Sequence, residues 1–447
     1  SEYFKADFSD PEAYAKAAAE LCRQVEAEGL VLLTNQNGAL PLPEQAKVSF
    51  FAQGAVYPGY GSTGSSAAKT DGYGSLRTAF EKKGFSVNGA LWDWYAQKAA
   101  RLRLNTVDGL VKTYRTNELP WEDVTAAQGE SFANFGDAAI VVLTRDSGEG
   151  FDVSTQGSDG LDGSYLSITK EEEDLLKGLT ELKQSGVFKR VIVLLNAAVP
   201  MQLDFLYRAD IDVDACLWVG NIGMSGAMGI ADVLAGSVNP SGRLTDTYTR
   251  DNFSSPAMAS WVLNPNGIFA QPYANATEMN LNSSQQYYGT RYEDYVIGRD
   301  QSGEYDYSVV AFPFGHGLSY TTFAYSDMKV TRQADSDSYV VTLTVTNTGS
   351  AAGREPVQIY LQKPYIEGDL EKASVELAGF TKTKLLQPGE SETVRVTVNG
   401  EFFRTYDAVE AQTYVLDPGD YYLAAGYNAH DALNNILASQ GFSPEST

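Results

Sequence analysis

The chain has 447 residues, 43% of them hydrophobic, which is enough for one to three domains with a sizeable core. Its 33 Lys and Arg against 57 Asp and Glu give a net charge of −24, which would repel a phosphate backbone and argues against nucleic-acid binding. No apolar run is long enough to span a membrane, and no signal peptide is visible, which favours a cytoplasmic location.

Cysteine and histidine are scarce. Cys22 lies in a helical pattern and Cys216 in an apolar run, so both are predicted to be buried thiols rather than parts of a disulfide framework. His316 and His430 have no ligand spacing to another His or Cys. We therefore expect no metal site and no cofactor.

The first half of the chain alternates helical patterns with short apolar runs. Residues 11–28 carry apolar side chains three and four positions apart, which predicts an amphipathic helix that ends at Gly29. Strands are predicted at 48–52, 85–87, 138–143, 191–195 and 215–219. Helices are predicted near 74–83, 90–104, 169–185, 200–208 and 224–236. Continuous apolar strands between helices predict a mostly parallel sheet, that is, a layered α/β sandwich over residues 1–250.

The second half has a different character. Residues 251–320 are irregular and rich in Asn, Ser, Gly and Tyr, and they end in a Gly-His-Gly step at 315–317 that suits a tight backbone crossing at a domain seam. Residues 321–430 alternate apolar and polar positions between turn signals, which predicts a β-sandwich of about seven strands. Residues 431–447 are polar and are predicted to be a linker tail.

One loop could carry chemistry. The apolar strand at 138–143 leads into a segment where Glu149 stands between two glycines, at the strand end where α/β proteins place their active groups. A carboxyl group presented there, in a closed site, could have a raised pKa and act as a general acid. A solvated surface loop explains the same residues. The other carboxylates that compete for the role are Asp146, Asp152, Asp159 and Asp162.

A second loop, residues 60–66, is rich in Gly and Ser and follows the first predicted strand. It lacks the Gly-Lys-Ser/Thr step of a P-loop and the G-x-G-x-x-G pattern of dinucleotide-binding proteins. A nucleotide-binding α/β protein is therefore poorly supported, and a plain surface loop stays open.

Several segments, in order along the chain, resemble glycoside hydrolase family 3. The matching segments are 18–43, the Gly-Glu-Gly-Phe-Asp loop at 148–152, 220–244 with its Asn-Pro-Ser-Gly-Arg-Leu ending, the Pro-Phe-Gly-His-Gly-Leu-Ser-Tyr run at 313–320, and 378–390. In that family the last run joins an α/β sandwich domain to a fibronectin-III-like domain. The resemblance therefore implies a fibronectin-III-like fold for residues 321–430.

The resemblance also implies an activity, that of a retaining β-glycosidase, most simply a β-glucosidase that releases terminal β-D-glucosyl residues from oligosaccharides or glucosides. Glu149 matches the family's acid/base residue. Ser62, Ser65 and Asp152 are then candidates for binding the sugar.

One departure from the family is large. The family's nucleophile is an Asp in a Ser-Asp-Trp motif on a separate (β/α)8 barrel, and this sequence has no such motif and no room for a barrel of ~250 residues. The resemblance therefore implies a member with reversed domain order and a barrel partner, on the same precursor or a separate chain. A homodimer stays open, and so does a non-catalytic carbohydrate-binding or scaffold protein built from these two domains.

Overall fold

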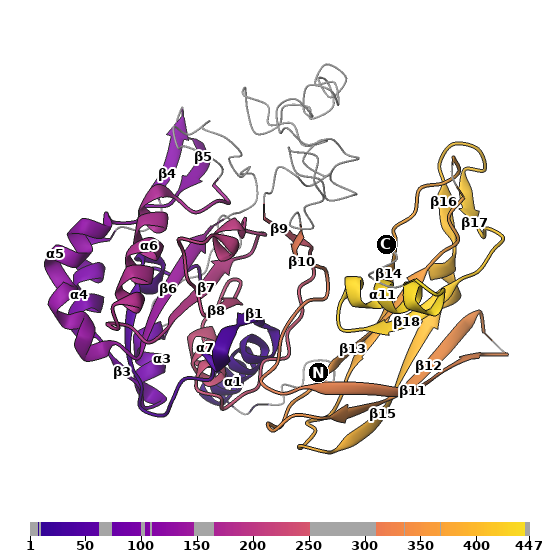
Figure 1. Cartoon of the computed structure of the whole chain (residues 1–447), viewed down its shortest axis with the longest axis horizontal. Helices are drawn as coiled ribbons and strands as arrows, with labels where there is room; N and C mark the ends of the chain where they lie inside the picture. Colours follow the sequence, from indigo (N-terminus) through magenta and orange to yellow (C-terminus); the bar gives the residue numbers. More distant parts are fainter. Residues whose placement is uncertain are drawn as a thin grey trace. The chain divides into compact units, whose positions relative to one another are not determined.

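A computed structural model describes residues 8, 10–61, 74–99, 103–107, 110–146, 165–250, 310–334, 336–366 and 368–442 (Figure 1). The chain divides into two compact units. The first comprises residues up to Val238 together with Thr247–Phe312, and the second comprises Asn239–Asp246 together with the chain from Pro313 onward.

The first unit is built on a six-stranded sheet in the order β1-β8-β7-β6-β2-β3. The strands are β1 (Val31–Asn35), β2 (Lys47–Phe51), β3 (Ser86–Val87), β6 (Ala138–Arg145), β7 (Val191–Ala197) and β8 (Ala215–Trp218). All neighbours are parallel except β1, which pairs antiparallel with β8. Every residue of β6 and β7 is buried, which explains their unbroken apolar sequence. The predicted mostly parallel sheet is confirmed.

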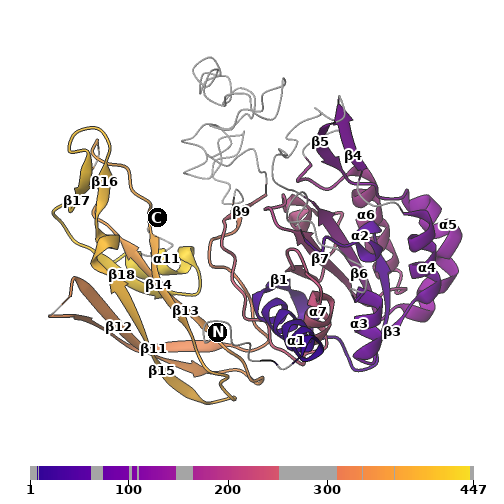
Figure 2. The same cartoon turned by 180° about the vertical axis from the view of Figure 1, so that it is seen from behind.

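The helices of this unit pack in two groups, with the sheet between them (Figures 1 and 2). In one group α7 (Gly226–Leu234) packs against α1 (Pro11–Gly29) and α3 (Leu76–Lys82). In the other, α5 (Trp121–Phe132) packs against α4 (Gly89–Lys98) and α6 (Lys170–Gln184). Helices on both sides hide the strands from water, as a parallel sheet requires.

Some local predictions differ from the structure. The helix predicted over 90–104 ends at Lys98, and the chain continues into a hairpin of β4 (Arg103–Val107) and β5 (Leu110–Arg115). The helix predicted near 200–208 is a single 3₁₀ turn, Asp204–Tyr207. A four-residue helix that the sequence did not predict, α2 (Gln53–Val56), follows β2. Helix α5 was not predicted, because it buries only Val124 and Phe132 and so has a weak apolar pattern.

The prediction that both cysteines are buried is wrong for Cys22. Cys216 lies inside β8 and is fully buried, whereas Cys22 is exposed on α1. Along α1 only Ala27 is buried, and Leu21 and Val25 are more than 60% exposed. The apolar spacing of this helix therefore marks its outward side, which the sequence pattern alone could not distinguish from a core face.

Helix α1 lies very close to α7 because glycine stands at the crossing. A Cβ atom placed on Gly229 would lie 2.6 Å from the carbonyl oxygen of Arg23. Arg23 also donates from Nε and Nη2 to the two carboxylate oxygens of buried Asp232, at 2.5 and 2.9 Å, and Lys83 reaches Asp232 at 2.9 Å. Two cations around one buried carboxylate hold α1, α3 and α7 together.

Glu26, in the same interface, supports a prediction about stability. Its buried Oε1 has no hydrogen-bond partner within the part of the chain that the structure describes, and burial raises the pKa of the carboxyl group to about 8. Because the folded-state pKa lies above the unfolded one, its stabilising contribution is complete below about pH 4.5 and is lost as the pH rises toward 8. Glu26→Gln should therefore raise the free energy of unfolding at pH 8 by roughly 2–4 kcal/mol and leave it nearly unchanged at pH 4.5.

Urea titrations at pH 4.5, 6 and 8 would measure this effect. Glu20→Gln, at an exposed position of the same helix, is the matched control and should change stability little at any pH. Equal effects of Glu26→Gln at all three pH values would show that burial does not raise the pKa of Glu26.

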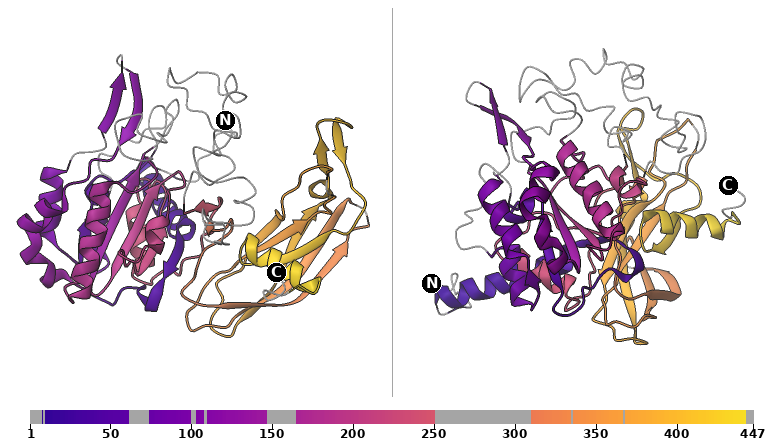
Figure 3. Two further views of the ribbon diagram at one scale, coloured as in Figure 1. Left: turned by 45° about the horizontal axis from the view of Figure 1, so that its top comes forward. Right: turned by 60° about the vertical axis from the view of Figure 1, so that its left-hand side comes forward.

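The second unit is a β-sandwich of two three-stranded antiparallel sheets, and it confirms the predicted fold (Figure 3). One sheet has the order β11-β12-β15, formed by Phe323–Arg332, Ser338–Asn347 and Ser391–Asn399. The other has the order β14-β13-β18, formed by Glu376–Lys382, Pro356–Gln362 and Tyr422–Gly426. Inward residues of both sheets, such as Val341, Ile359 and Val396, form one hydrophobic core. A separate hairpin pairs β16 (Thr405–Asp407) with β17 (Thr413–Val415).

The Gly-His-Gly step lies where the backbone crosses closely packed neighbours, as predicted. Gly315 has φ +82°, and a Cβ there would lie 2.2 Å from Oε1 of Gln358. A Cβ on Gly317 would lie 2.2 Å from the carbonyl oxygen of Gly242. Residues 239–246 thus run beside 313–320 in the second unit, whereas the sequence pattern grouped them with residues 1–250. In the first unit, β9 (Tyr248–Thr249) pairs with β10 (Val310–Phe312).

Residues 429–439 form a helix where the sequence suggested the start of a linker. Asn428 caps α11 (Ala429–Ser439), which buries Ala432 and Ile436 against the sandwich. The sequence did not predict this helix because only one side of it is covered.

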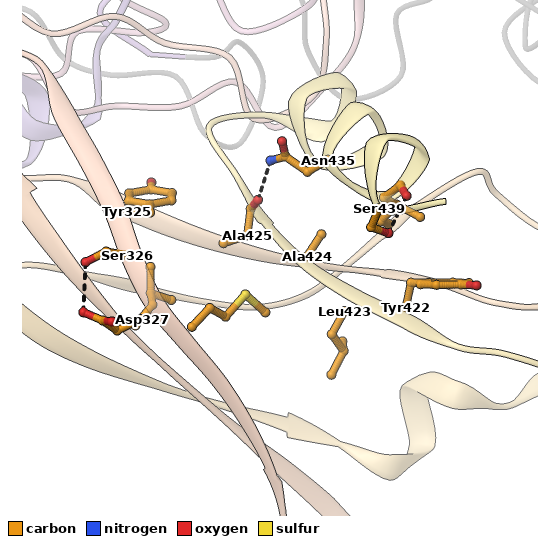
Figure 4. A pocket seen from close by; sticks show the side chains of 12 residues that line it. Tyr325, Ser326, Asp327, Tyr422, Leu423, Ala424, Ala425, Asn435 and Ser439 are labelled. Carbon is orange, nitrogen blue, oxygen red and sulfur yellow. Dashed lines mark hydrogen bonds between the residues drawn. The ribbon is translucent and has the colours of Figure 1, made fainter. Parts of the chain in front are cut away.

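Between β11, β18 and α11 lies a pocket of about 410 Å³, lined by the side chains in Figure 4. Asn435 donates from its amide to the carbonyl oxygen of Ala425 at the rim, and the buried Leu343 joins the pocket to the core.

Candidate active site

The carboxyl-terminal ends of the parallel strands meet at one edge of the first unit's sheet, and Asn196 at the end of β7 ties them together. Its Oδ1 accepts from the backbone N–H of Gly59 at 2.5 Å and from Oγ1 of Thr144, in β6, at 3.1 Å. Its Nδ2 donates to the carbonyl oxygens of Gly59 at 3.1 Å and of Gly220, just after β8, at 2.5 Å. One buried amide therefore joins the segments that follow β2, β6 and β8.

Asp146 brings a carboxylate to this edge. It directly follows β6 and is only 6% exposed, and its backbone N–H donates to the hydroxyl of Tyr165 at 2.8 Å. A Cβ on Gly59 would lie 2.9 Å from Oδ1 of Asp146 and 3.3 Å from Oδ1 of Asn221. Glycine at position 59 thus lets the backbone approach two oxygen-bearing side chains closely.

Arg145, the last residue of β6, is fully buried and surrounded by acceptors. Its guanidinium donates to both carboxylate oxygens of Glu172, at 2.8 and 2.6 Å. It also donates to the carbonyl oxygens of Thr144 at 3.0 Å, Tyr165 at 2.6 Å and Ser167 at 2.6 Å. A buried bidentate pair with further backbone acceptors fixes the guanidinium in one orientation.

A second carboxyl group at this edge, Glu118, was not predicted from the sequence. It accepts from the backbone N–H of Gln53 at 2.7 Å and of Leu119 at 3.0 Å, and burial raises the pKa of its carboxyl group to about 7. It supports the turn after β2, where Ala52 has the unusual φ of +72°. Glu118 lies in no motif, so only the fold identifies it.

The residues singled out from the sequence fall mostly beyond what the structure describes. Glu149, Asp152, Asp159 and Asp162 lie in residues 147–164, and Ser62 and Ser65 lie in residues 62–73, both outside the described residues. Of the predicted carboxylates only Asp146 is placed. The described flanks of both segments nevertheless come together, since Gly59 lies beside Asp146.

Among the described residues, no cluster of three or more His, Cys, Asp or Glu side chains could hold a metal ion. In the same part of the chain, no helix combines the length and the apolar character needed to cross a membrane.

Comparison with known proteins decides the family. Residues 30–320 match the glycosyl hydrolase family 3 C-terminal domain. The chain belongs to glycosyl hydrolase family 3. Residues 355–429 match a fibronectin type III-like domain, in agreement with the β-sandwich of the second unit. The family suggested by the ordered motifs is therefore confirmed.

The relatives of this family 3 chain include two bacterial enzymes. It is 29% identical over 450 residues to beta-glucosidase A of Butyrivibrio fibrisolvens, covering 92% of this chain and 50% of that protein. It is 31% identical over 428 residues to a beta-glucosidase of Ruminococcus albus, covering 94% of this chain and 40% of that protein. The structure of beta-glucosidase 3B from Thermotoga neapolitana in complex with alpha-D-glucose superimposes with a TM-score of 0.72, at 28% identity, over 95% of this chain and 54% of that one. The chain thus spans about half the length of the proteins it matches.

Proposed function

We propose that this chain is the α/β-sandwich and fibronectin-III-like portion of a retaining β-glucosidase and that Glu149 is its general acid/base. The observation that carries the proposal is the match to family 3 together with relatives named beta-glucosidase. Its place in the sequence supports the proposal, because Glu149 comes four residues after the end of β6, and Asp146, Asn196 and Gly59 meet at that end of the strand.

The proposed reaction needs two carboxyl groups about 5–5.5 Å apart. Glu149 gives its proton to the glycosidic oxygen while an aspartate attacks the anomeric carbon, so the aglycone leaves as an alcohol and a glycosyl-enzyme ester forms. Water then attacks that carbon, Glu149 takes the water's proton, and the aspartate leaves. The sugar keeps its β configuration because the anomeric carbon is inverted twice.

The aspartate nucleophile is proposed to come from a (β/α)8 barrel, on the same precursor or on a separate chain. The support is the absence of a Ser-Asp-Trp motif here and the length of the relatives, about twice that of this chain. Ser62, Ser65 and Asp152 are proposed to hydrogen-bond the sugar, on segments whose described flanks Asn196 joins.

The product of the full-length enzyme tests the reaction class. Proton NMR during hydrolysis of a β-glucoside should show β-glucose first and the α anomer only after mutarotation. Hydrolysis of the matching β-xyloside, measured in parallel, would report glycone preference. Initial release of α-glucose would overturn the retaining mechanism. Oligosaccharide binding without turnover, with every partner chain present, would favour a carbohydrate-binding or scaffold protein.

A further inference from the structure

We propose that Arg145 is a positioning residue for acid catalysis, because it ties together the two ends of the segment that carries Glu149. This inference rests on the proposed role of Glu149. Arg145 itself touches no reacting atom in the proposal; it acts through the residues on either side of positions 147–164.

The first end of the segment is held by the sheet. Arg145 is the last residue of β6, in register with Ala197 of β7, and its side chain donates back to the carbonyl oxygen of Thr144 at 3.0 Å. Its guanidinium is therefore anchored to a strand that is buried along its whole length. Asp146, the last described residue before the segment, follows directly.

The second end is held by the same guanidinium. Nε donates to the carbonyl oxygen of Tyr165 and Nη2 to that of Ser167, both at 2.6 Å. The two ends also touch directly, since the N–H of Asp146 donates to the Tyr165 hydroxyl at 2.8 Å. The Tyr165 ring lies 5.6 Å from the guanidinium carbon, within reach of a cation–π contact. One side chain thus links the residues that leave β6 to those that return.

Glu172 extends the link to helix α6. Besides its two bonds from Arg145, it accepts from the backbone N–H of Thr169 at 2.8 Å, and its own N–H donates to Oγ1 of Thr169 at 3.2 Å. This capping box fixes the first turn of α6. The side chains of Arg145 and Glu172 are 0% and 4% exposed, so solvent does not weaken the pair.

The arrangement requires arginine. Five N–H donors in a planar fork serve two carboxylate oxygens and three carbonyl oxygens at once, whereas an ammonium group has three donors at a single point. Lysine would keep the charge but leave buried acceptors unpaired, and the two ends of the segment would separate or shift. Misplacing a catalytic group by about 1 Å can cost ~10²-fold in rate.

A leaving-group series on the full-length enzyme tests the proposal. Arg145→Lys should lower kcat/KM by roughly 10–100-fold for cellobiose and alkyl glucosides, which need protonation, and by less than about 3-fold for 2,4-dinitrophenyl β-glucoside, which does not. Glu172→Gln should also lower kcat/KM more for substrates that need protonation than for 2,4-dinitrophenyl β-glucoside, but by a smaller factor. Arg23→Lys is the matched control, because it alters a bidentate pair between Arg23 and the buried Asp232 in another part of the unit, and it should leave the leaving-group dependence unchanged.

Three outcomes separate the possibilities. An equal loss on every substrate, or a lowered Tm alone, would overturn a positioning role and leave a structural one. If Arg145→Lys does not fold, Tyr165→Phe removes the hydroxyl that accepts from the Asp146 N–H and must still steepen the leaving-group dependence. In an enzyme that already carries Glu149→Gln, Arg145→Lys should cause no further loss of kcat/KM on substrates with poor leaving groups. A Glu149→Gln enzyme without leaving-group dependence would refute the assignment of Glu149 itself, whatever Arg145 does.

Discussion

Glu149→Gln in the full-length enzyme is expected to lower turnover of disaccharides and alkyl glucosides by about 10²–10⁴-fold, the usual contribution of general acid–base catalysis. Glutamine keeps the size of the side chain but cannot give a proton to the departing oxygen. An activated aryl glucoside needs little protonation, so its first step should remain fast and the glycosyl-enzyme should accumulate. Steady-state rates, together with the burst of released phenol, would measure both effects.

External azide provides the decisive check on the same variant. It attacks the glycosyl-enzyme without needing a general base, so it should restore turnover of the aryl substrate and give β-glucosyl azide. Asp146→Asn is the matched control, since Asp146 is a buried carboxylate that directly follows β6, and its variant should show no azide rescue. Wild-type rates of Glu149→Gln on a disaccharide would reject the assignment and direct attention to Asp146 and Asp152.

The second large effect concerns this chain alone. The purified 447-residue chain is expected to fold but to hydrolyse no glycoside. General acid catalysis supplies ~10²–10⁴-fold, far below the ~10⁶–10¹⁷-fold accelerations of whole enzymes, and the proposed nucleophile and closed site are missing. Adding a separately produced barrel domain should restore activity if the two parts associate. Release of 4-nitrophenol from its β-glucoside would be measured with each part alone and with both.

The matched control for this reconstitution is the same chain carrying Glu149→Gln, which should associate with the barrel equally well but restore far less activity on poor leaving groups. Glucosidase turnover by the wild-type 447-residue chain without a barrel would refute the divided active site. A second carboxylate would then have to be sought among Asp152, Asp159 and Asp162.

Much of the fold follows from local sequence. The apolar runs of β6 and β7 predict buried parallel strands because both faces of such strands are covered, and the alternating pattern of β15 predicts a half-buried antiparallel strand. These predictions succeed because neighbouring residues alone decide the periodicity. For α1 the spacing predicts the helix correctly but does not say which side of it is covered. For α11 the polar sequence predicts a linker where the structure has a helix.

The sequence by itself determined the family, the two folds and Glu149 as the candidate acid, because each depends on residues close together in the chain. Only the tertiary structure decided what surrounds the strand ends. Asn196 joins Gly59 to Gly220, and Arg145 meets Glu172, across separations that no local pattern records. Glu118 acquires its raised pKa from burial beside the turn after β2, which depends on distant segments folding against it. Hydrogen-bond partners and burial are properties of the packed chain, so the supporting residues of the site emerge only once the sheet has brought its strand ends together.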